Sequence, residues 1–377
     1  MINGQNPAGI YIHVPFCRKK CQYCDFCSVA ASSEPMRAAY VARLCDELAR
    51  TSPTAHGRRF DTVYFGGGTP TLLTAQQLCD ILAAVRQYYT VEDGAEITLE
   101  CNPATVDDDA LHALRYGGFN RLSIGMQSAN DGELCALGRI HRHGDVIRTV
   151  DAARAAGFDN LSLDLMYGIP GQTQDSFAKT LREAIALSPE HLSAYSLIVE
   201  PGTPFYEKRN TLPLPDEDTL CAMTEQLLTT LRGAGYERYE ISNFSRPGKE
   251  SRHNLHYWSM DDYLGFGPAA HALWCGTRTG HSRDIAAYLD GADITEPEET
   301  LDADAERDEY VMLRLRLARG IDKTAYRARF GESFDARYAA RLTPYLTAGY
   351  ARSDADTVAL TDRGMDISNH ILSELLF

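Results

Sequence analysis

The chain has no long apolar run, no block of basic residues and no tandem repeat or low-complexity tract. No apolar stretch reaches the roughly 18 residues that a membrane-spanning helix needs. The first residues, MINGQNPAGIYIHVPFC, lack the basic start and the apolar core of a signal peptide. The net charge is -15 and Lys and Arg form no cluster, so nucleic acid is not an expected partner. These absences predict a globular cytoplasmic protein.

Cysteine is abundant by contrast, with ten residues in a chain of 377. Four of them lie within the stretch CRKKCQYCDFC, which runs from Cys17 to Cys27. In a reducing compartment, thiols that are grouped in this way indicate a metal site or catalysis before they indicate disulfides.

Short apolar runs rich in β-forming residues alternate with helical patterns over the first two hundred residues. The expected strands cover residues 10–14, 62–65, 96–100, 121–127, 161–168 and 191–200. The expected helices between them cover residues 36–50, 74–89, 107–118, 145–157 and 173–187. Six βα repeats predict a parallel sheet with right-handed crossovers. We therefore expect an α/β fold built on a partial, TIM-like (β/α)6 barrel.

The pattern changes after this region, and it predicts three parts of the chain. Residues 1–245 are expected to form the barrel, and residues 246–300, which are rich in Gly and polar residues, an extension of it. Residues 301–377 are mainly helical in pattern, with one strand expected near residues 357–364. A small β wing among helices predicts a mainly helical, winged-helix-like C-terminal lobe.

The first three cysteines of the cluster, Cys17, Cys21 and Cys24, have the spacing C-x3-C-x2-C and follow the first expected strand. Thiolates on a short loop suit zinc or an iron–sulfur cluster, and structural zinc usually uses paired ligands joined by a longer spacer. A [4Fe–4S] cluster on three thiolates leaves one iron open to chelate S-adenosylmethionine (SAM) and to drive radical chemistry. As a fourth ligand Cys27 would close that iron; the alternative is a nearby thiol with no essential role.

Polar residues follow several expected strands at their carboxyl ends, which is where the site of an α/β barrel lies. These positions are the glycines of GGGTP (66–70), Glu100, Gln127 with Ser128, Arg139 and Asp164. Each alone is more often a turn, a helix cap or a solvated side chain. Together they predict a binding site at one end of the barrel.

The stretches IYIHVPFC, GGGTPT, ITLECNP, NRLSIGMQS, LGRIH and LDLMYGIPGQT resemble one family of the radical SAM superfamily, the oxygen-independent coproporphyrinogen III oxidase-like proteins. The resemblance runs through about residues 9–275. It implies a radical SAM barrel, a [4Fe–4S] cluster on Cys17, Cys21 and Cys24, and an electron donor for that cluster. It also implies SAM contacts from Tyr11, Tyr23, Gly67, Gly68, Thr69, Glu100, Gln127, Arg139, Asp164 and Ile198.

Within this family, three features resemble the haem chaperone branch (HemW) more than the dehydrogenase branch. The dehydrogenase pattern C-x3-C-x2-C-x-C would place a cysteine at Phe26, whereas the next cysteine here is Cys27. Only sixteen residues precede Cys17, where the dehydrogenase has a long segment. The stretch HNLHYW, residues 253–258, resembles the HNxxYW signature that the chaperone branch associates with haem.

The resemblance makes His253, Tyr257 and Trp258 candidates for haem binding. A neutral imidazole is a good axial ligand of haem iron, and the two aromatic side chains can pack on the macrocycle. The alternative is a buried histidine within an aromatic core cluster. His256 and His271 are further candidate ligands with weaker support.

The resemblance therefore implies a chaperone that binds haem and passes it to an acceptor haemoprotein, for which a membrane-associated protein is one candidate. The alternative is an enzyme that decarboxylates two propionates of coproporphyrinogen III to vinyl groups, so that a porphyrinogen would be the ligand. A third alternative is radical methylation or cyclisation of another substrate. No residue is assigned a catalytic role.

Overall fold

The computed structural model describes residues 6–297 and 299–376, and a single twelve-stranded sheet organises the larger part of them. Six neighbouring strands of this sheet are parallel. They are β1 (Ala8–Val14), β4 (Arg59–Gly67), β5 (Thr90–Cys101), β6 (Arg121–Gln127), β7 (Leu161–Tyr167) and β8 (His191–Ser196). The predicted partial (β/α)6 barrel is confirmed.

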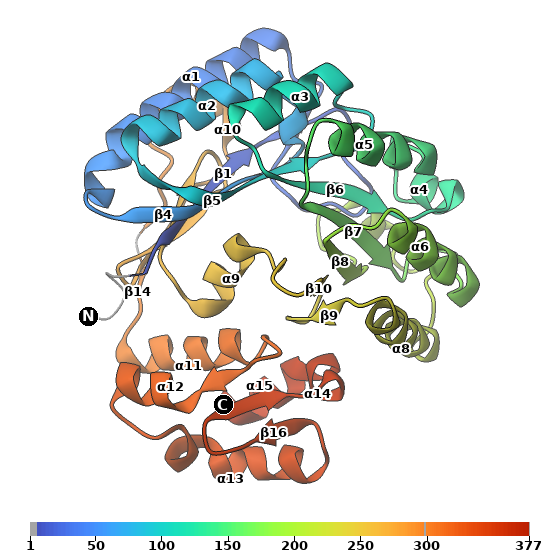
Figure 1. Ribbon diagram of the computed structural model, residues 1–377, viewed down its shortest axis with the longest axis vertical. Helices are drawn as coiled ribbons and strands as arrows, with labels where there is room; N and C mark the ends of the chain where they lie inside the picture. The colour runs from blue at the N-terminus through green and yellow to red at the C-terminus, as the bar shows by residue number, and fades with distance from the viewer. Residues whose placement is uncertain (1–5, 298, 377) are drawn as a thin grey trace.

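Helices cover the outer face of these strands (Figure 1). They are α1 (Glu34–Thr51), α2 (Ala75–Tyr88), α3 (Asp108–Gly117), α5 (His143–Ala155), α6 (Gln174–Ala186) and α8 (Glu217–Gly233). Local sequence sets their ends: Thr74 and Gln77 form a capping box at the start of α2, and Gly118, with φ of 108°, ends α3. The strands are apolar because both faces of a parallel sheet are covered, and every residue of β6 is buried.

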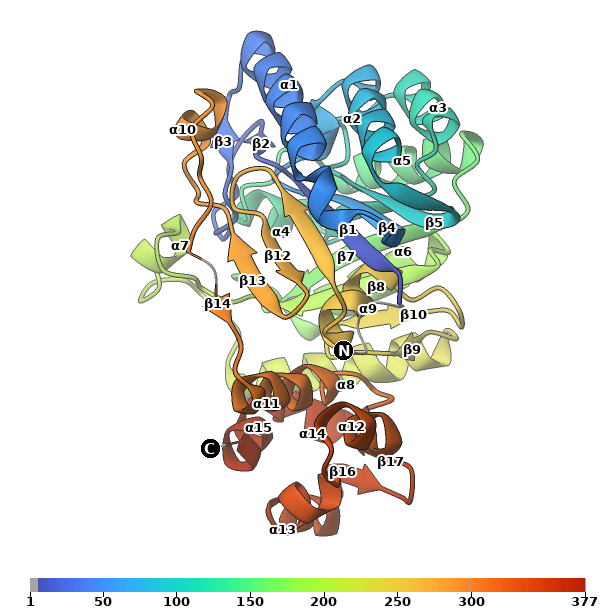
Figure 2. The same cartoon turned by 90° about the vertical axis from the view of Figure 1, so that its left-hand side faces the viewer.

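The sheet continues beyond the six predicted strands at both edges. A seventh parallel strand, β11 (Tyr263–Phe266), pairs with β1 and is followed by antiparallel β12 (His271–Trp274), β13 (Thr277–Gly280) and β14 (Glu299–Thr300). The other edge carries antiparallel β10 (Asn243–Ser245) and β9 (Glu237–Arg238). The polar segment 246–300 is thus joined to the barrel sheet, and Figure 2 shows its hairpin β12–β13 facing the viewer.

Several shorter elements differ from the expectation. The strand expected over residues 191–200 ends at Ser196, and the chain then turns into the one-turn helix α7 (Pro204–Glu207). Helix α4 (Asp131–Ala136) follows β6, and the short strands β2 (Phe16–Cys17) and β3 (Val29–Ala30) flank the cysteine loop. Helix α9 (Arg252–Ser259) carries HNLHYW. Each is too short for a sequence period to reveal it.

The C-terminal lobe has its own apolar core and is mainly helical, as expected. Its helices are α11 (Ala303–Arg314), α12 (Lys323–Phe330), α13 (Phe334–Thr347), α14 (Asp362–Asp366) and α15 (Ser368–Leu376). A three-stranded antiparallel sheet of β15 (Ile321–Asp322), β17 (Thr357–Leu360) and β16 (Ala351–Ser353) forms the wing. The exact division at residues 245 and 300 stays a prediction.

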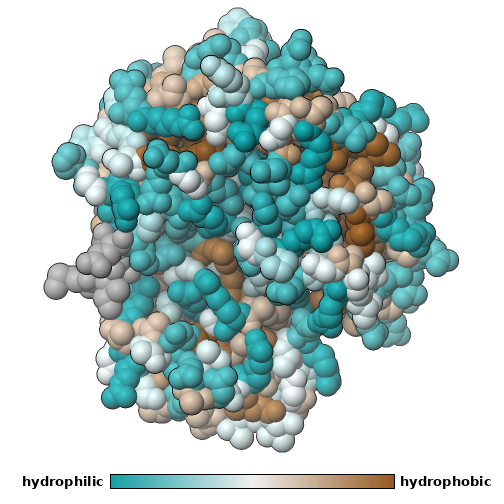
Figure 3. All heavy atoms as spheres, in the orientation of Figure 1, coloured by the Kyte–Doolittle hydropathy of each residue, from teal (hydrophilic) through white to brown (hydrophobic). Residues whose placement is uncertain are grey.

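Hydrophilic residues cover most of the face that Figure 3 shows. Within residues 6–297 and 299–376, no helix combines the length and the apolar character needed to cross a bilayer.

Candidate functional site

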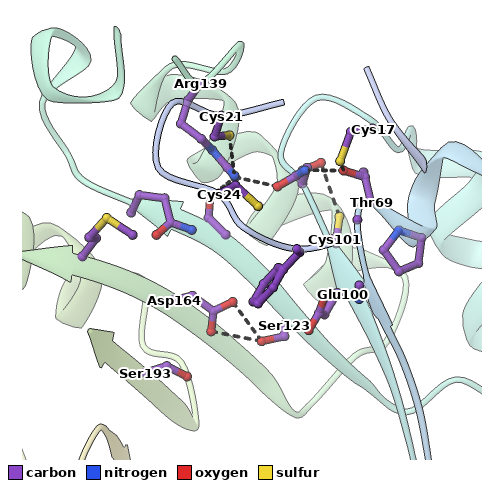
Figure 4. A pocket seen from close by; sticks show the side chains of 18 of the residues that line it. Cys17, Cys21, Cys24, Thr69, Glu100, Cys101, Ser123, Arg139, Asp164 and Ser193 are labelled. Carbon is purple, nitrogen blue, oxygen red and sulfur yellow. Dashed lines mark hydrogen bonds between the residues drawn. The ribbon is translucent and has the colours of Figure 1, made fainter. Parts of the chain in front are cut away.

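A cavity of about 330 Å³ opens at the carboxyl ends of the barrel strands and is lined by the three cysteines of the C-x3-C-x2-C triplet. Figure 4 shows Cys17, Cys21 and Cys24 at one side of this cavity and Glu100, Ser123 and Asp164 at the other. The cavity reaches from the cysteine loop down to Asn254 of α9. The structure therefore brings the thiols and the polar strand ends into one space.

Backbone hydrogen bonds fix the cysteine loop against the barrel. The amide of Gln22 donates to the carbonyl of Leu137 at 3.0 Å, and the amide of Phe205 donates to the carbonyl of Gln22 at 3.0 Å. The amide of Thr69 donates to the carbonyl of Phe16 at 2.7 Å, beside Cys17. Helices α4 and α7, which the sequence did not reveal, thus help to hold the loop in place.

A chain of polar side chains connects Cys17 to Cys21 across the mouth of the barrel. Thr69 Oγ1 lies 3.5 Å from Cys17 Sγ and accepts a hydrogen bond of 2.6 Å from Asn102. Arg139 donates to Asn102 Oδ1 at 2.5 Å and, through its other terminal nitrogen, to Cys21 Sγ at 3.8 Å. Through Thr69, Asn102 and Arg139, this network holds Cys17 and Cys21 in fixed positions at the mouth of the barrel.

Two half-buried carboxyl groups, Glu100 and Asp164, face the cavity from β5 and β7. Glu100 accepts hydrogen bonds from the Tyr64 hydroxyl at 2.8 Å and the Gly67 amide at 3.2 Å. Burial raises the pKa of Glu100 to about 7 despite these bonds, and burial also raises the pKa of Asp164. A cation that binds in the cavity would lower the pKa of these carboxyl groups again and so favour their ionised form.

Other cavity residues show how tightly the barrel shapes this space. Gln127 is buried with φ of 61°, a left-handed conformation that non-glycine residues rarely adopt and that is often retained at functional sites. Arg121, which is buried and was not singled out from the sequence, also lines the cavity. Its Nε has no hydrogen-bond partner within the described residues. Asn102 and Ser193 were missed as well; Asn102 stands in the quoted stretch ITLECNP, directly after Glu100 and Cys101.

Eight of the ten residues expected to contact SAM line the cavity, and two do not. The eight are Tyr23, Gly67, Gly68, Thr69, Glu100, Gln127, Arg139 and Asp164. Tyr11 instead lies beside the stacked rings of Tyr64 and His253, and its hydroxyl is 3.0 Å from His13 Nδ1. Ile198 lies after β8 with 67% of its surface exposed.

The donor set suits an iron–sulfur cluster, because three thiols on one loop reach one cavity. No three His, Cys, Asp or Glu side chains of the described ranges are arranged as a site for a metal ion. Cys27 does not line the cavity: its Sγ lies 3.5 Å from the carbonyl oxygen of Arg283, in a neighbouring groove. The fourth cysteine of the stretch is thus held apart from the triplet.

The HNLHYW stretch forms α9, which is anchored at the amino-terminal end of the barrel strands. The backbone amides of Arg252 and His253 each donate to the Glu96 carboxylate at 3.2 Å, so this carboxylate caps the helix. At the far end of α9, the Trp258 ring packs under the guanidinium of Arg316 from the C-terminal lobe, at 4.6 Å. This helix therefore connects the barrel interior with the lobe.

The three residues expected to bind haem lie in two different environments. His253 is 1% exposed, and its Nδ1 and Nε2 lie 2.8 Å from Thr62 Oγ1 and 2.7 Å from the Tyr257 hydroxyl. Burial holds the pKa of His253 well below its usual range, so the ring is neutral with both nitrogens already bonded. Tyr257 and Trp258 line the groove that also contains Cys27.

His256, the other histidine of HNLHYW, is not suited to bind haem iron in this conformation. Burial lowers its pKa, but hydrogen bonds with Asp261 and Asp61 outweigh that effect and raise the pKa to about 9. Its Nε2 lies 2.7 Å from Asp61 Oδ1. A protonated imidazole has no lone pair for a metal.

Known proteins match the chain over almost its whole length. Residues 11–184 match the model of the Radical SAM superfamily, and residues 301–367 match the HemN C-terminal domain. The chain is 35% identical to Heme chaperone HemW of Bacillus subtilis over 97% of this chain and 98% of that protein. It is also 35% identical to Heme chaperone HemW of Escherichia coli, over 98% of each.

Among solved structures, coproporphyrinogen III oxidase (HemN) from Escherichia coli, a radical SAM enzyme, has a TM-score of 0.86. The alignment covers 98% of this chain and 90% of that one at 24% sequence identity. This likeness concerns the fold.

Proposed function

Because this chain belongs to the HemW family of haem chaperones, within the radical SAM superfamily, we propose that it binds haem and delivers it to acceptor haemoproteins. The observation that carries the proposal is the likeness to these relatives along the whole chain, from the cysteine loop to the C-terminal lobe. The alternative activity on coproporphyrinogen III has no comparable support, because the likeness to HemN concerns the fold alone.

The proposal assigns the [4Fe–4S] cluster to Cys17, Cys21 and Cys24. It is supported by their shared cavity and by the separation of Cys27 from that cavity. Such a cluster, when bound with SAM, supplies one-electron chemistry. The chain's own contribution is to hold the thiols through the network of Thr69, Asn102 and Arg139.

The proposal places SAM in the same cavity, against the eight lining residues named above. Glu100 and Asp164 would pair with the ammonium or accept hydrogen bonds from ribose hydroxyls, while Arg139 donates to Cys21 at the other side of the cavity. Gly68 leaves no room for a Cβ, so the backbone itself forms this wall of the cavity. Tyr11 and Ile198 have no part in this assignment.

Haem would be the cargo and an acceptor haemoprotein the partner, for which a membrane-associated protein is one candidate. An electron donor for the cluster belongs to the same proposal, and the cytoplasmic location stays a prediction. His253 is better suited to a structural role than to iron ligation, because both ring nitrogens are bonded within the protein.

Haem transfer tests this function. The anaerobically reconstituted protein is loaded with haemin, freed of excess ligand and mixed with increasing concentrations of an apo-b-type cytochrome. Apomyoglobin serves as a scavenger that reports passive release. We expect transfer to the cytochrome to become faster as its concentration rises, beyond the passive rate. A protein that retains no haemin after removal of excess ligand would refute the proposal.

A further inference from the structure

A groove of about 620 Å³ lies next to the cavity, and its lining includes residues of the cysteine loop and of the hairpin β12–β13. Its volume falls within the roughly 300–1,000 Å³ of ligand pockets. The residues that matter for its chemistry are Phe26, Tyr257, Trp258, His271, His281 and Arg283. Phe26 lines both spaces, so the groove directly adjoins the cysteine triplet.

Three histidines line the groove, and they differ in what their ring nitrogens contact. His13 is bonded at both nitrogens, to the Tyr11 hydroxyl at 3.0 Å and to the carbonyl of Cys27 at 2.9 Å. His281 donates through Nδ1 to the carbonyl of Gly267 at 2.9 Å. The ring of His271 is exposed and makes no hydrogen bond or ion pair within the described parts of the chain.

The position of His271 in the hairpin gives its ring room. His271 pairs with Gly280 across the β12–β13 ladder. A Cβ at position 280 would lie 2.8 Å from His271 Nδ1, so any other residue there would displace the ring. The sheet therefore holds an imidazole with both nitrogens unbonded at the wall of an open groove.

The rest of the groove offers aromatic surface and one guanidinium. Phe26 is 64% exposed, and Tyr257 and Trp258 contribute from α9. Arg283 has an exposed guanidinium that lies 3.6 Å from the Asp25 carboxylate, and Glu296 is the other carboxylate of the lining. A flat aromatic ligand with an anionic group and a metal that accepts imidazole would match this combination.

We propose that haem binds in this groove with its iron ligated by His271. The macrocycle packs against Phe26 and Trp258, and one propionate pairs with Arg283 in competition with Asp25. The inference rests on the proposed haem-carrying function and adds the site. The proposed site gives the HNLHYW stretch a part in haem binding although His253 is buried. Tyr257 and Trp258 form the groove wall, and His253 holds Tyr257 in place.

Titration with haemin, followed by the Soret absorption, tests this site in the wild-type protein and in three variants. His271→Ala removes the proposed ligand, His281→Ala removes the neighbouring histidine, and His112→Ala is a matched control at an exposed position far from the groove. We expect His271→Ala to weaken binding by about tenfold or more, equivalent to about 1.4 kcal/mol, and to shift the Soret band. Free imidazole should restore the wild-type spectrum, which a purely structural role would not explain.

The two proposals fail in different ways. If wild-type protein binds no haemin, the proposed function fails and the site fails with it. If wild-type protein binds haemin and His271→Ala has the same affinity and spectrum, only the site is refuted. Loss of binding in His281→Ala with no change in His271→Ala would equally refute His271 as the ligand.

Discussion

The Nε2 atom of His253 lies 2.7 Å from the hydroxyl oxygen of Tyr257, one turn further along α9. The other ring nitrogen, Nδ1, is hydrogen-bonded to Thr62 Oγ1 at 2.8 Å, so the histidine joins helix α9 to strand β4 in the barrel. The first residue of HNLHYW is thus a structural residue of the barrel interior. The aromatic residues at its end are the ones that reach an open groove.

We expect His253→Ala to lower the free energy of unfolding by about 2–4 kcal/mol, because it removes the hydrogen-bond partner of the buried Thr62 hydroxyl and of the Tyr257 hydroxyl and opens a void. Tyr257→Phe removes one hydroxyl and should cost only about 1 kcal/mol. Urea denaturation measures both. The Soret band of the folded His253→Ala protein should keep its position, and a shifted band with unchanged stability would contradict the structural role.

Replacing any cysteine of the triplet should abolish the cluster. After anaerobic reconstitution we expect about four irons per chain in the wild-type protein and almost none in Cys17→Ala, Cys21→Ala or Cys24→Ala. Cys27→Ala is the matched control and should keep the full iron content, because its thiol faces the groove instead of the cavity. Iron analysis and the charge-transfer absorption of the cluster give the result. Loss of iron in Cys27→Ala would make that thiol a ligand.

The glycine run after β4 is expected to be intolerant of side chains. A Cβ at Gly68 would lie 2.6 Å from the carbonyl oxygen of Phe16, next to Cys17, so the backbone must shift. We expect Gly68→Ala to cost about 1–3 kcal/mol of stability and to lower iron incorporation. Gly94→Ala, where an added Cβ meets nothing within 4 Å, should stay within about 0.5 kcal/mol of the wild type. Equal behaviour of the two variants would contradict this account.

The carboxyl group of Glu100 should make stability depend on pH in the ligand-free protein. Burial raises its pKa from 4.5 to about 7, so between these values the folded state holds a proton that the unfolded state has released. The free energy of unfolding therefore falls as the pH rises through this window. Glu100→Gln removes this pH dependence. Between pH 4.5 and 7.5, the free energy of unfolding of the variant should therefore rise by up to about 3 kcal/mol relative to that of the wild type.

Urea denaturation of both proteins across this pH range measures that difference. SAM binding supplies the control, because the Glu100→Gln variant lacks the carboxylate that is proposed to pair with SAM. We expect this variant to bind SAM at least about tenfold more weakly than the wild type at pH 7.5. A difference in stability that does not change with pH would contradict the raised pKa.

The sequence predicted the parts of the fold that repeat. The six barrel strands are runs of buried apolar residues, and β6 was located at its exact bounds because both of its faces are covered. The strands β11 to β14 escaped prediction because each has at most four residues, and Gly, Arg, His and Thr interrupt their apolar pattern. The register of β11 depends on pairing with β1, which is about 250 residues earlier in the chain, so that no local pattern reveals it.

The residues of the candidate site also fall into those that the sequence predicted and those that it could not predict. The cysteine spacing and the strand-end residues were predictable, because the carboxyl ends of parallel strands meet at one edge. The environment of His253 was not, because its partner Thr62 is 191 positions away. The same holds for Arg121, because the placement of this first residue of β6 toward the cavity depends on the register of the strand within the sheet.

The most direct measurement is an anaerobic assay of the reconstituted protein with SAM, reductant and coproporphyrinogen III, with a HemN enzyme as positive control. A haem chaperone should form no protoporphyrinogen IX while its cluster is intact and the control turns over, and the same preparation should bind haemin in stoichiometric amount. Multiple turnovers of coproporphyrinogen III, with no haemin retained, would contradict the account and make this chain an enzyme of porphyrin synthesis.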